Sequence, residues 1–277
     1  MSVFITSLNS GSNGNCYYIG TSQEAVLIDV GISCRETERR MQILGLSMQT
    51  VKAIFISHEH SDHIKGLPVL SKKYDLPVYI TQNTLLRSGL RLTGNRVEEL
   101  APYTPIVIGG ISVLAFPKYH DAVDPHSFLI RCNTINIGVF TDIGMNCEHV
   151  AKHFEQCDAA FLEANYDSKM LEGGHYPQYL KNRIRGGKGH LSNDQALEIF
   201  LSHRPPFMTH LLLSHLSKEN NNPEHVQQLF NKHAAGVKIH IASRDRQSPV
   251  FAIGKHPKSP ERKSHRETGI LTQMKLF

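Results

Sequence analysis

One short segment, His58-Glu59-His60-Ser61-Asp62-His63, places four potential metal ligands within six residues. It follows the apolar run 53–56, which predicts a strand that ends near this segment. If the backbone stays extended, side chains 58, 60 and 62 project to one side and His63 to the other. Imidazole and carboxylate groups are the usual ligands of catalytic zinc, so the segment predicts the start of two neighbouring metal sites. The competing interpretation is a polar loop in a chain with 17 histidines, but the regular alternation with an aspartate in register favours the metal sites.

The composition predicts one domain with an appended tail. A chain of 277 residues can bury a full core. Residues 255–277 hold six Lys or Arg and two Glu, so most of the net charge of +5 belongs to this end of the chain. We therefore expect one folded domain over residues 1–254 and a flexible basic tail over residues 255–277.

Membrane insertion, secretion and a disulfide framework are not predicted. No apolar run approaches the length of a membrane-spanning helix, and the N-terminus lacks the basic and apolar regions of a secretory signal. The five cysteines are odd in number and lack metal-finger spacing. These features predict a cytoplasmic protein with no membrane partner.

Strand candidates dominate the first 150 residues, and helices return after residue 145. The expected strands are 3–5, 16–19, 25–28, 53–56, 78–80, 106–108, 111–114, 128–130, 138–140, 211–213 and 238–242. Ser33 with Glu36 and Ser192 with Gln195 have capping-box spacing and predict two helix starts. Further helices are expected at 149–156 and 223–233.

Five candidate ligand motifs each lie at the end of a strand candidate. They are Asp29, the segment 58–63, His120, Asp142 and His215. A lone His or Asp is usually structural, but five in this order resemble the metallo-β-lactamase superfamily. The resemblance implies an α+β fold, an αβ/βα four-layer sandwich of the tRNase Z-like type, with a dinuclear site at one sheet edge. His126 competes with His120 for the third motif, but a following strand that begins at Phe128 favours His120.

The resemblance also implies how the ligands divide between two divalent ions. One ion would be held by His58, His60 and His120, the other by Asp62, His63 and His215, and Asp142 would bridge them. Each ion would keep an open position for a shared water, so that a metal-bridging hydroxide attacks the substrate. Asp29 would fix the tautomer of a ligating histidine. Because the set contains no cysteine, zinc, manganese and iron all remain open.

Further motifs resemble the bacterial YycJ/WalJ group, which is described as 5′→3′ DNA exonucleases linked to mismatch repair. These motifs are the run 7–16, the stretches 162–167 and 189–193, and the segment 213–217. An Asp at position 142 also resembles the phosphodiesterase branches of the superfamily. The resemblance therefore implies a metal-dependent phosphodiesterase, most specifically a 5′→3′ DNA exonuclease in DNA repair.

Two more residues gain catalytic roles beside Asp62 from this resemblance. The segment around His190 resembles the tRNase Z segment whose histidine protonates the leaving oxygen, and Glu163 resembles the glutamate that orients it. A phosphodiester needs such an acid because the departing 3′-alkoxide is a poor leaving group. The competing interpretation is that His190 only precedes the helix cap at Ser192 and that Glu163 is an ordinary carboxylate at a strand end.

Basic residues near His190 are candidates for DNA contacts. Lys181, Arg183, Arg185 and Lys188 interleave with glycines, and exposed backbone N–H groups together with cations bind phosphate. A solvated basic loop explains the same residues equally well. By residue type alone, Ser243, Arg244 and Ser248 form another candidate site for a terminal phosphate.

The last five residues, Gln273-Met274-Lys275-Leu276-Phe277, resemble the bacterial sliding-clamp motif Gln-Leu-x-Leu-Phe. Met274 keeps the apolar length and flexibility that a hydrophobic groove accepts. The resemblance makes Gln273, Met274, Leu276 and Phe277 candidate clamp contacts, and such a tether would raise the effective concentration of the enzyme at DNA. An ordinary chain end that matches by chance is the alternative.

Two other functions compete with the nuclease. The first is a hydrolase of the same fold that acts on a small ester, thioester or lipid phosphodiester, because a scaffold alone does not decide function. Activity on nucleic acid but not on small esters separates the two. The second is a metal-stabilised, non-catalytic repair interaction module, which the full ligand set disfavours because a structural zinc site is closed and usually mononuclear.

Overall fold

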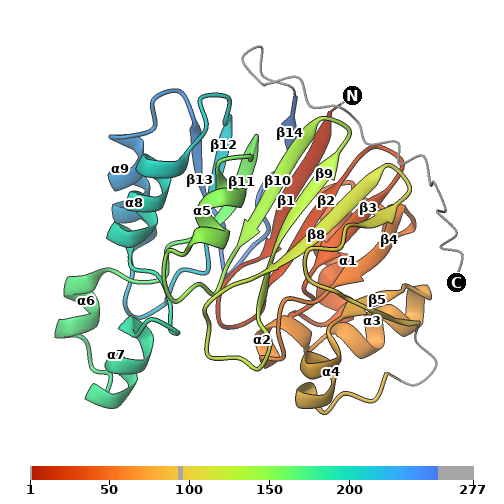
Figure 1. The fold of residues 1–277 in the computed structure, drawn as a ribbon, viewed down its shortest axis with the longest axis horizontal. Helices are drawn as coiled ribbons and strands as arrows, with labels where there is room; N and C mark the ends of the chain where they lie inside the picture. The colour runs from red at the N-terminus through yellow and green to blue at the C-terminus, as the bar shows by residue number, and fades with distance from the viewer. Residues whose placement is uncertain (1, 93–95, 255–277) are drawn as a thin grey trace, which may run out of the picture.

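The fold is built on two seven-stranded β-sheets that pack face to face (Figure 1). The computed structural model describes residues 2–92 and 96–254, so the predicted tail 255–277 and its clamp motif lie outside the described residues. In spatial order, sheet A contains β14 (Phe251–Ile253), β1 (Val3–Asn9), β2 (Cys16–Gly20), β3 (Ala25–Ile28), β4 (Val51–Phe55), β5 (Val78–Ile80) and β6 (Val97–Glu99). Sheet B contains β13 (Lys238–Ile241), β12 (His210–Ser214), β11 (Ala159–Glu163), β10 (Ile135–Phe140), β9 (His126–Cys132), β8 (Ile111–Pro117) and β7 (Ile106–Ile108).

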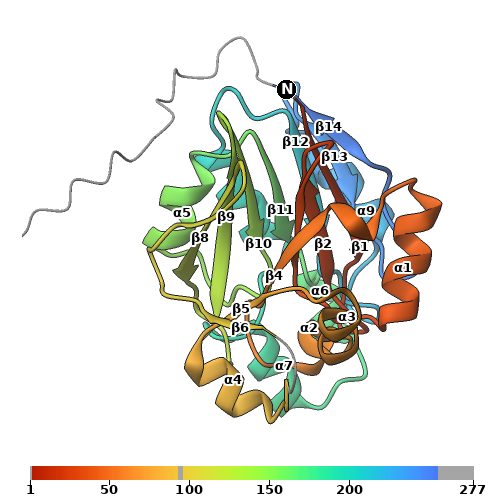
Figure 2. The ribbon, with the colours of Figure 1, turned by 90° about the vertical axis from the view of Figure 1, so that its right-hand side faces the viewer.

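Helices cover the outer face of each sheet. The helices are α1 (Cys34–Ile43), α2 (Ser61–Ile64), α3 (Leu67–Tyr74), α4 (Gln82–Ser88), α5 (Glu148–Phe154), α6 (Ser168–Gly173), α7 (Gln178–Arg185), α8 (Asn193–His203) and α9 (Pro223–Asn231), with a 3₁₀ turn at Met48–Thr50. Figure 2 shows the two sheets between α5 on one side and α1 on the other. No helix within the described residues is long and apolar enough to cross a membrane.

Three apolar clusters hold the layers together. The central cluster lies between the sheets, and the two outer clusters lie between each sheet and its helices. Strand β3 shows how one strand contributes to two clusters. Val26 and Ile28 face the central cluster, whereas Leu27 faces the cluster beneath the outer helices. The strand is therefore apolar on both faces, as expected for a buried strand. The predicted αβ/βα four-layer sandwich is confirmed.

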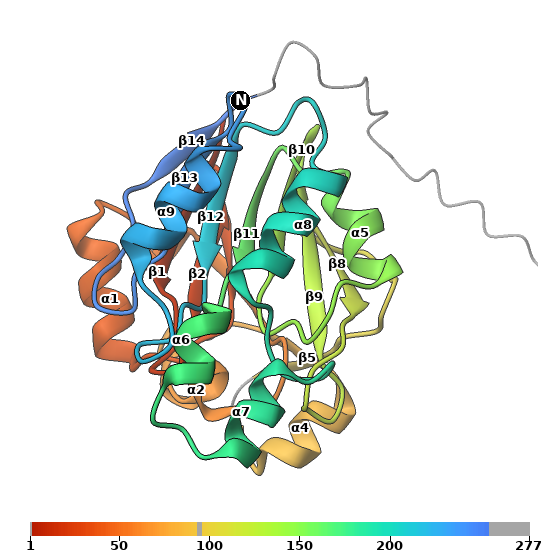
Figure 3. The same cartoon turned by 90° about the vertical axis from the view of Figure 1, so that its left-hand side faces the viewer.

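Parallel pairing brings the ends of many strands to one edge of the sandwich. In sheet A, β3 to β6 run parallel, and in sheet B, β10 to β13 run parallel. Loops that follow the carboxyl ends of such strands gather at one edge, where α/β folds place their ligands. Figure 3 shows α6 and α7 at this end of the molecule, below the helices that cover sheet B.

The structure corrects several expected element boundaries. Strand β9 begins at His126, whereas the sequence placed its start at Phe128. The capping box at Ser192 and Gln195 is present, but at α1 only half of the expected box forms. There Ser33 accepts from the Glu36 backbone N–H, while the Glu36 carboxylate bonds to two arginines instead.

Candidate metal centre and active site

Strand ends in both sheets deliver the candidate ligands to the same edge. Asp29 follows β3, Asp142 follows β10 and His215 follows β12. All three have left-handed backbone, with φ of 60°, 54° and 57°. Asp and His tolerate this region better than most residues, but each such position still costs of order 1–3 kcal/mol. Three strained residues at one sheet edge are typical of a functional site, where strain is retained because it aims side chains.

Three histidines converge in the first group of donors. His58 Nε2 lies 3.1 Å from His60 Nδ1, and His120 Nε2 lies 3.4 Å from the same atom. Ligand atoms of a tetrahedral zinc site are about 3.3 Å apart, given metal–nitrogen distances of about 2.05 Å. His120 donates from Nδ1 to the carbonyl oxygen of Gly189, a contact of 3.0 Å that leaves Nε2 as the free donor atom. This trio therefore has the spacing of a metal site.

A second group lies next to the first and is richer in carboxylate. Asp62 Oδ2 lies 3.5 Å from both His63 Nε2 and His215 Nε2. Asp142 lies between the two groups, with Oδ2 3.2 Å from His63 Nε2, and Oδ1 3.5 Å from His215 Nε2 and 3.9 Å from His120 Nε2. The predicted bridging residue thus occupies the position between the two candidate sites.

The local backbone of the histidine-rich segment differs from the prediction. It is extended only to His60, which caps α2, and Asp62 and His63 lie within that helical turn. The expectation that side chains 58, 60 and 62 project to one side is therefore wrong for Asp62. The turn forms because the His63 backbone N–H donates to the His60 carbonyl oxygen, 2.9 Å away. Its effect is to direct Asp62 and His63 toward the second group together.

The two groups have different electrostatics. In the first, burial lowers the pKa of His58 well below its ordinary value and that of His120 to about 3, so both imidazoles are neutral and can donate a lone pair. In the second, burial acts in the same direction, but nearby carboxylates, Asp142 foremost, raise the pKa of His63 well above its ordinary value and that of His215 to about 10. A cation entering the second group would displace protons from these rings.

The residues present fit a pair of divalent cations. Asp142 Oδ2 is buried, makes no well-aligned hydrogen bond among the described residues and lies 3.2 Å from His63 Nε2, a spacing that suits two ligands of one cation. The other donors are imidazole nitrogens and a carboxylate, with no thiol, a set that suits zinc, manganese or iron.

Asp29 contacts one of the candidate ligands from behind. Its Oδ2 lies 2.7 Å from His63 Nδ1, so the ring must present Nε2 to the cluster. Ser57 extends the contact, because its backbone N–H and hydroxyl donate to the two Asp29 oxygens and its hydroxyl lies 2.9 Å from His58 Nδ1. One buried carboxylate therefore organises ligands of both groups.

Sequence reasoning gave no role to Ser57, Asn15 or Asn165. Asn15 Nδ2 lies 3.1 Å from Asp62 Oδ2, and Asn165 Nδ2 donates to the His215 carbonyl oxygen at 2.8 Å. Both asparagines stand in stretches that carried the resemblance to the exonuclease group, which was the available signal. Their contacts join segments about 50 residues apart, so residue type alone does not reveal them.

His190 and Glu163 lie on the sheet B side of the cluster. His190 Nδ1 is 2.7 Å from Glu163 Oε1, and the same oxygen is 3.2 Å from His215 Nδ1. Glu163 is fully buried, and burial by itself would raise its pKa. The charge of His190 and hydrogen bonds from His190 and His215 outweigh burial and lower the pKa of Glu163, so the carboxylate is ionised. Its Oε2 accepts the Ile143 backbone N–H at 2.6 Å. A buried, fixed carboxylate thus holds a histidine at the rim of the cluster.

The remaining candidates lie outside the two donor groups. His126 lies outside the donor groups, and its Nδ1 donates to the Asp124 carbonyl oxygen. Arg183 pairs with Asp121 and Arg185 with Glu172, so internal carboxylates already neutralise these two. Lys181 is buried and donates to the Glu172 carbonyl oxygen, whereas Lys188 is exposed. Arg244 lines a separate pocket together with Leu216, the residue that follows His215.

Comparison with known proteins identifies the family and the fold of the chain. The sequence profile of the family described as Beta-lactamase superfamily domain matches residues 24–215, a span that contains every candidate ligand. The structure also resembles the metallo-β-lactamase fold protein YhfI from Bacillus subtilis, with a TM-score of 0.68 at 16% identity, over 91% of this chain and 100% of that one. Fold and profile thus agree on the class of protein.

Two curated relatives match along most of their length. Exodeoxyribonuclease YycJ of Bacillus anthracis is 33% identical over 253 residues, which cover 86% of this chain and 92% of the relative. Exodeoxyribonuclease WalJ of Streptococcus pneumoniae is 32% identical over 222 residues, 78% of this chain and 82% of the relative. The chain therefore belongs to the β-lactamase superfamily of metal-dependent hydrolases, in the group that includes YycJ and WalJ.

Proposed function

We propose that this enzyme is a dinuclear-metal-dependent phosphodiesterase that removes nucleotides from the 5′ end of DNA. The observation that carries the proposal is the His190–Glu163 pair beside two adjacent donor groups, because a phosphodiester, unlike an activated ester, needs an acid for its leaving oxygen. The relatives named exodeoxyribonuclease support DNA as the substrate. Action in DNA repair belongs to the same proposal.

Seven side chains would hold the cations. They are His58, His60 and His120 for one ion, Asp62, His63 and His215 for the other, and Asp142 between them. Bound divalent cations supply Lewis-acid charge to the scissile phosphate and make a water acidic enough to attack near neutral pH. Asp29 keeps His63 in the ligating tautomer, as its 2.7 Å contact requires.

The proton for the leaving group comes from His190 in this proposal. Its Nδ1 is committed to Glu163, so Nε2 is the nitrogen that can donate to a departing 3′-oxygen. Glu163 stabilises the charged ring and fixes its plane, because its other oxygen is tied to the Ile143 backbone. His190 is the proton donor, and Glu163 is a positioning residue.

The test uses a 5′-phosphorylated, end-labelled duplex with manganese or zinc. We expect stepwise release of 5′-terminal nucleotides by the wild type and a loss of at least about 10³-fold in Asp62→Ala, because a ligand to the second ion is removed. Asp194→Ala, an exposed aspartate at the start of α8, is the matched control and should retain full activity. Cleavage by Asp62→Ala at the wild-type rate would reject the proposal.

The C-terminal motif adds a proposed partner. Gln273, Met274, Leu276 and Phe277 lie outside the described residues and are proposed as contacts to a bacterial sliding clamp from their order alone. Deleting residues 273–277 should abolish binding to the clamp while nuclease activity on short duplexes is retained. Unchanged clamp affinity after the deletion would reject this partner.

A further inference from the structure

A second feature of the active-site edge is a pocket beyond His215, with a volume of about 720 Å³. Leu216 lines it and is the neighbour of His215 in the chain. Ser10 also lines it, and its hydroxyl accepts the His215 backbone N–H at 2.8 Å. The pocket therefore adjoins the second donor group, and its size is in the range of sites that bind small ligands or single nucleotides.

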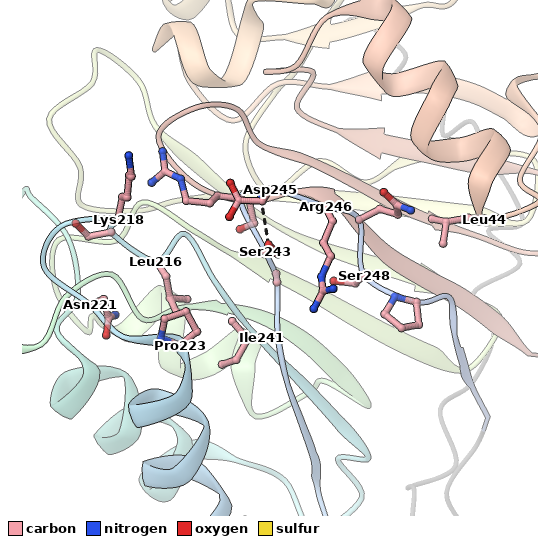
Figure 4. Close-up of a pocket in the computed structure, with 16 residues that line it drawn as sticks. Leu44, Leu216, Lys218, Asn221, Pro223, Ile241, Ser243, Asp245, Arg246 and Ser248 are labelled. Carbon is pink, nitrogen blue, oxygen red and sulfur yellow. Dashed lines mark hydrogen bonds between the residues drawn. The ribbon is translucent and has the colours of Figure 1, made fainter.

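The pocket has an apolar wall and a basic rim (Figure 4). Leu44, Leu216, Ile241 and Pro223 supply apolar surface, which suits a sugar or a base. The rim carries Lys218, Arg244 and Arg246, and Asp245 is the one acidic side chain among the lining residues. In Figure 4 the Arg246 side chain points into the pocket, toward the space between Ser248 and Ile241.

These rim cations differ from the basic residues of α7. Arg183 and Arg185 are paired with carboxylates, whereas Lys218, Arg244 and Arg246 form no ion pair with any described residue. Unpaired arginines that surround a pocket are suited to a phosphate, which a guanidinium binds through two hydrogen bonds. The rim is therefore the better candidate for phosphate recognition.

A buried hydroxyl points to the same ligand. The Ser248 side chain is 6% exposed, lines the pocket, and its Oγ has no hydrogen-bond partner among the described residues. A buried polar atom without a partner is costly, so this hydroxyl is poised to bond to something that enters the pocket. A phosphate oxygen beside Arg246 would satisfy it.

The loop that carries these groups is held in place without a ligand. Asn13 Nδ2 donates to the Arg244 carbonyl oxygen at 2.9 Å, and the Ser10 backbone N–H donates to the Ser243 carbonyl oxygen at 3.1 Å. The Ser248 backbone N–H donates to the Ser7 carbonyl oxygen at 2.9 Å. Binding would thus cost little ordering entropy, as expected for a preformed site.

We propose that this pocket binds the nucleotide on the 5′ side of the scissile bond, with its 5′-phosphate on Arg246 and Ser248 and its sugar and base against Leu216 and Ile241. This inference rests on the proposed function. The rings of His190 and His215 are 5.2 Å apart between centroids, and Leu216, the residue after His215, lines the pocket. A nucleotide whose 3′-oxygen lies at His190 would therefore run along His215 to reach the pocket. A pocket that holds one nucleotide and its 5′-phosphate at this position explains why single nucleotides are removed from a 5′ end.

The first test measures binding of the 5′-phosphate without any cleavage. Calorimetry on the full-length chain measures the affinity for three compounds. They are dAMP, which carries a 5′-phosphate, its isomer with a 3′-phosphate, and deoxyadenosine, which has no phosphate. We expect the 5′-phosphate to bind best, and Arg246→Ala to weaken it by about tenfold or more, because a charge-assisted pair is lost. Ser248→Ala should also weaken the binding of dAMP by about tenfold. This substitution removes no hydrogen bond within the protein, because the Ser248 hydroxyl has no partner among the described residues.

The matched control is Lys232→Ala, which removes an exposed cation at the other end of α9 from Pro223. It should leave the dAMP affinity unchanged. Equal affinity for the two phosphate isomers, or unchanged dAMP affinity in both Arg246→Ala and Ser248→Ala, would overturn the proposal.

The second test separates this inference from the proposed function. Initial rates are compared on duplexes with a 5′-phosphate and with a 5′-hydroxyl, and the wild type should prefer the phosphate by about tenfold, a preference that Arg246→Ala reduces toward one. A wild type without end preference would overturn the role of the pocket even if DNA is cleaved. Arg246-dependent binding of dAMP by a chain that cleaves no DNA would retain the pocket and reject the nuclease.

Discussion

At the residue scale, the His190–Glu163 pair distinguishes this site from a generic cluster of metal ligands. The pair is joined at 2.7 Å, and Glu163 is fully buried and ionised. A carboxylate in such surroundings stabilises a charged imidazole far more than an exposed carboxylate would, because water does not screen the interaction. The pair therefore fixes the His190 ring at the rim of the cluster with Nε2 left to donate to a leaving oxygen.

Replacement of His190 should affect substrates according to their leaving groups. We expect His190→Ala to lower kcat on DNA by about 10²- to 10⁴-fold, the usual contribution of a general acid. On bis(p-nitrophenyl) phosphate, whose leaving group departs without a proton, the loss should stay below about tenfold. His203→Ala is the matched control, because His203 also bonds a glutamate through Nδ1, at 2.9 Å, but on the surface. Equal losses on both substrates would show that His190 does not act as the proton donor.

Asp29 offers a second prediction at this scale. Asp29→Asn keeps a residue type that tolerates the φ of 60° but weakens the contact that fixes His63. We expect the affinity for one of the two metal ions to fall by about 10- to 100-fold, as found for supporting carboxylates behind ligating histidines. Asp75→Asn, at a φ of 48° at the end of α3, controls for the backbone and should bind metal normally. Wild-type affinity for both ions in Asp29→Asn would contradict the assigned role.

At the element scale, α1 fixes the loops beside the active-site edge through one buried cation. Arg40 donates to the Leu8 carbonyl oxygen, to Asn9 Oδ1 and to the Asp245 carbonyl oxygen, at 2.7, 2.6 and 3.1 Å. It also pairs with Glu36 one turn earlier in the helix. The helix thereby ties the carboxyl end of β1 to the loop that lines the pocket.

The stability that Glu36 provides should depend on pH. Hydrogen bonds from Arg39 and Arg40, against an opposing effect of burial, lower the pKa of Glu36 to about 2 from an ordinary value of 4.5. A carboxyl whose pKa falls on folding stabilises the fold above its unfolded pKa, and that contribution is lost as the pH falls from 4.5 toward 2. We expect Glu36→Gln to lower the free energy of unfolding by about 1 kcal/mol at pH 7.

Urea denaturation between pH 2.5 and pH 7 measures this effect, with the wild type and Glu36→Gln compared at each pH. The difference between them should shrink steadily below the ordinary pKa of a glutamate. Glu148→Gln, an exposed first-turn residue of α5 with no ion pair among the described residues, should show no such difference. A difference that stays constant down to the lowest pH would indicate that Glu36 acts through packing and not through its charge.

The sequence predicted strands better than helices for a physical reason. Buried strands such as β3 and β12 are apolar runs bounded by turn residues, a pattern that needs no knowledge of neighbours. The short helices α2, α3, α4, α6 and α7 were not expected, because a helix of about two turns or fewer has little stability of its own. These helices form where tertiary contacts hold their ends, as at Lys181, whose buried ammonium bonds to the Glu172 carbonyl oxygen.

The same contrast applies to the active-site edge. The order of histidines and aspartates at strand ends was sufficient to nominate a metal cluster, since few other roles require that pattern. The hydroxyl and amide groups that support the cluster, such as Ser57 and Asn15, are common in loops and carry no such pattern. The pocket beyond His215 is assembled from segments that span residues 10 to 249, so only the fold brings it together.

At the scale of the whole molecule, the donor groups connect the two sheets. His58, His60, Asp62 and His63 follow β4 of sheet A, whereas His120, Asp142 and His215 follow β8, β10 and β12 of sheet B. Each donor group takes ligands from both sheets, so bound cations would join the two halves of the sandwich. The charged side chains gathered there would then be neutralised in the interior, where unpaired charge is most costly.

Metal removal should therefore lower the stability of the entire fold and not only of one loop. At metal concentrations of 1,000 times Kd, bound metal adds about 4 kcal/mol, which corresponds to a rise in Tm of roughly 10 °C for a domain of this size. We expect chelation to lower the Tm of the wild type by this amount and added manganese or zinc to restore it. In Asp142→Asn, which keeps the shape and the left-handed backbone but loses the negative charge between the two donor groups, the metal-dependent gain should be largely lost. Asp194→Asn, an exposed residue that belongs to neither donor group, should respond to chelation as the wild type does. A Tm that is independent of metal in a wild type shown to bind two ions would mean that the sheets hold together without the cluster, which would then serve chemistry alone.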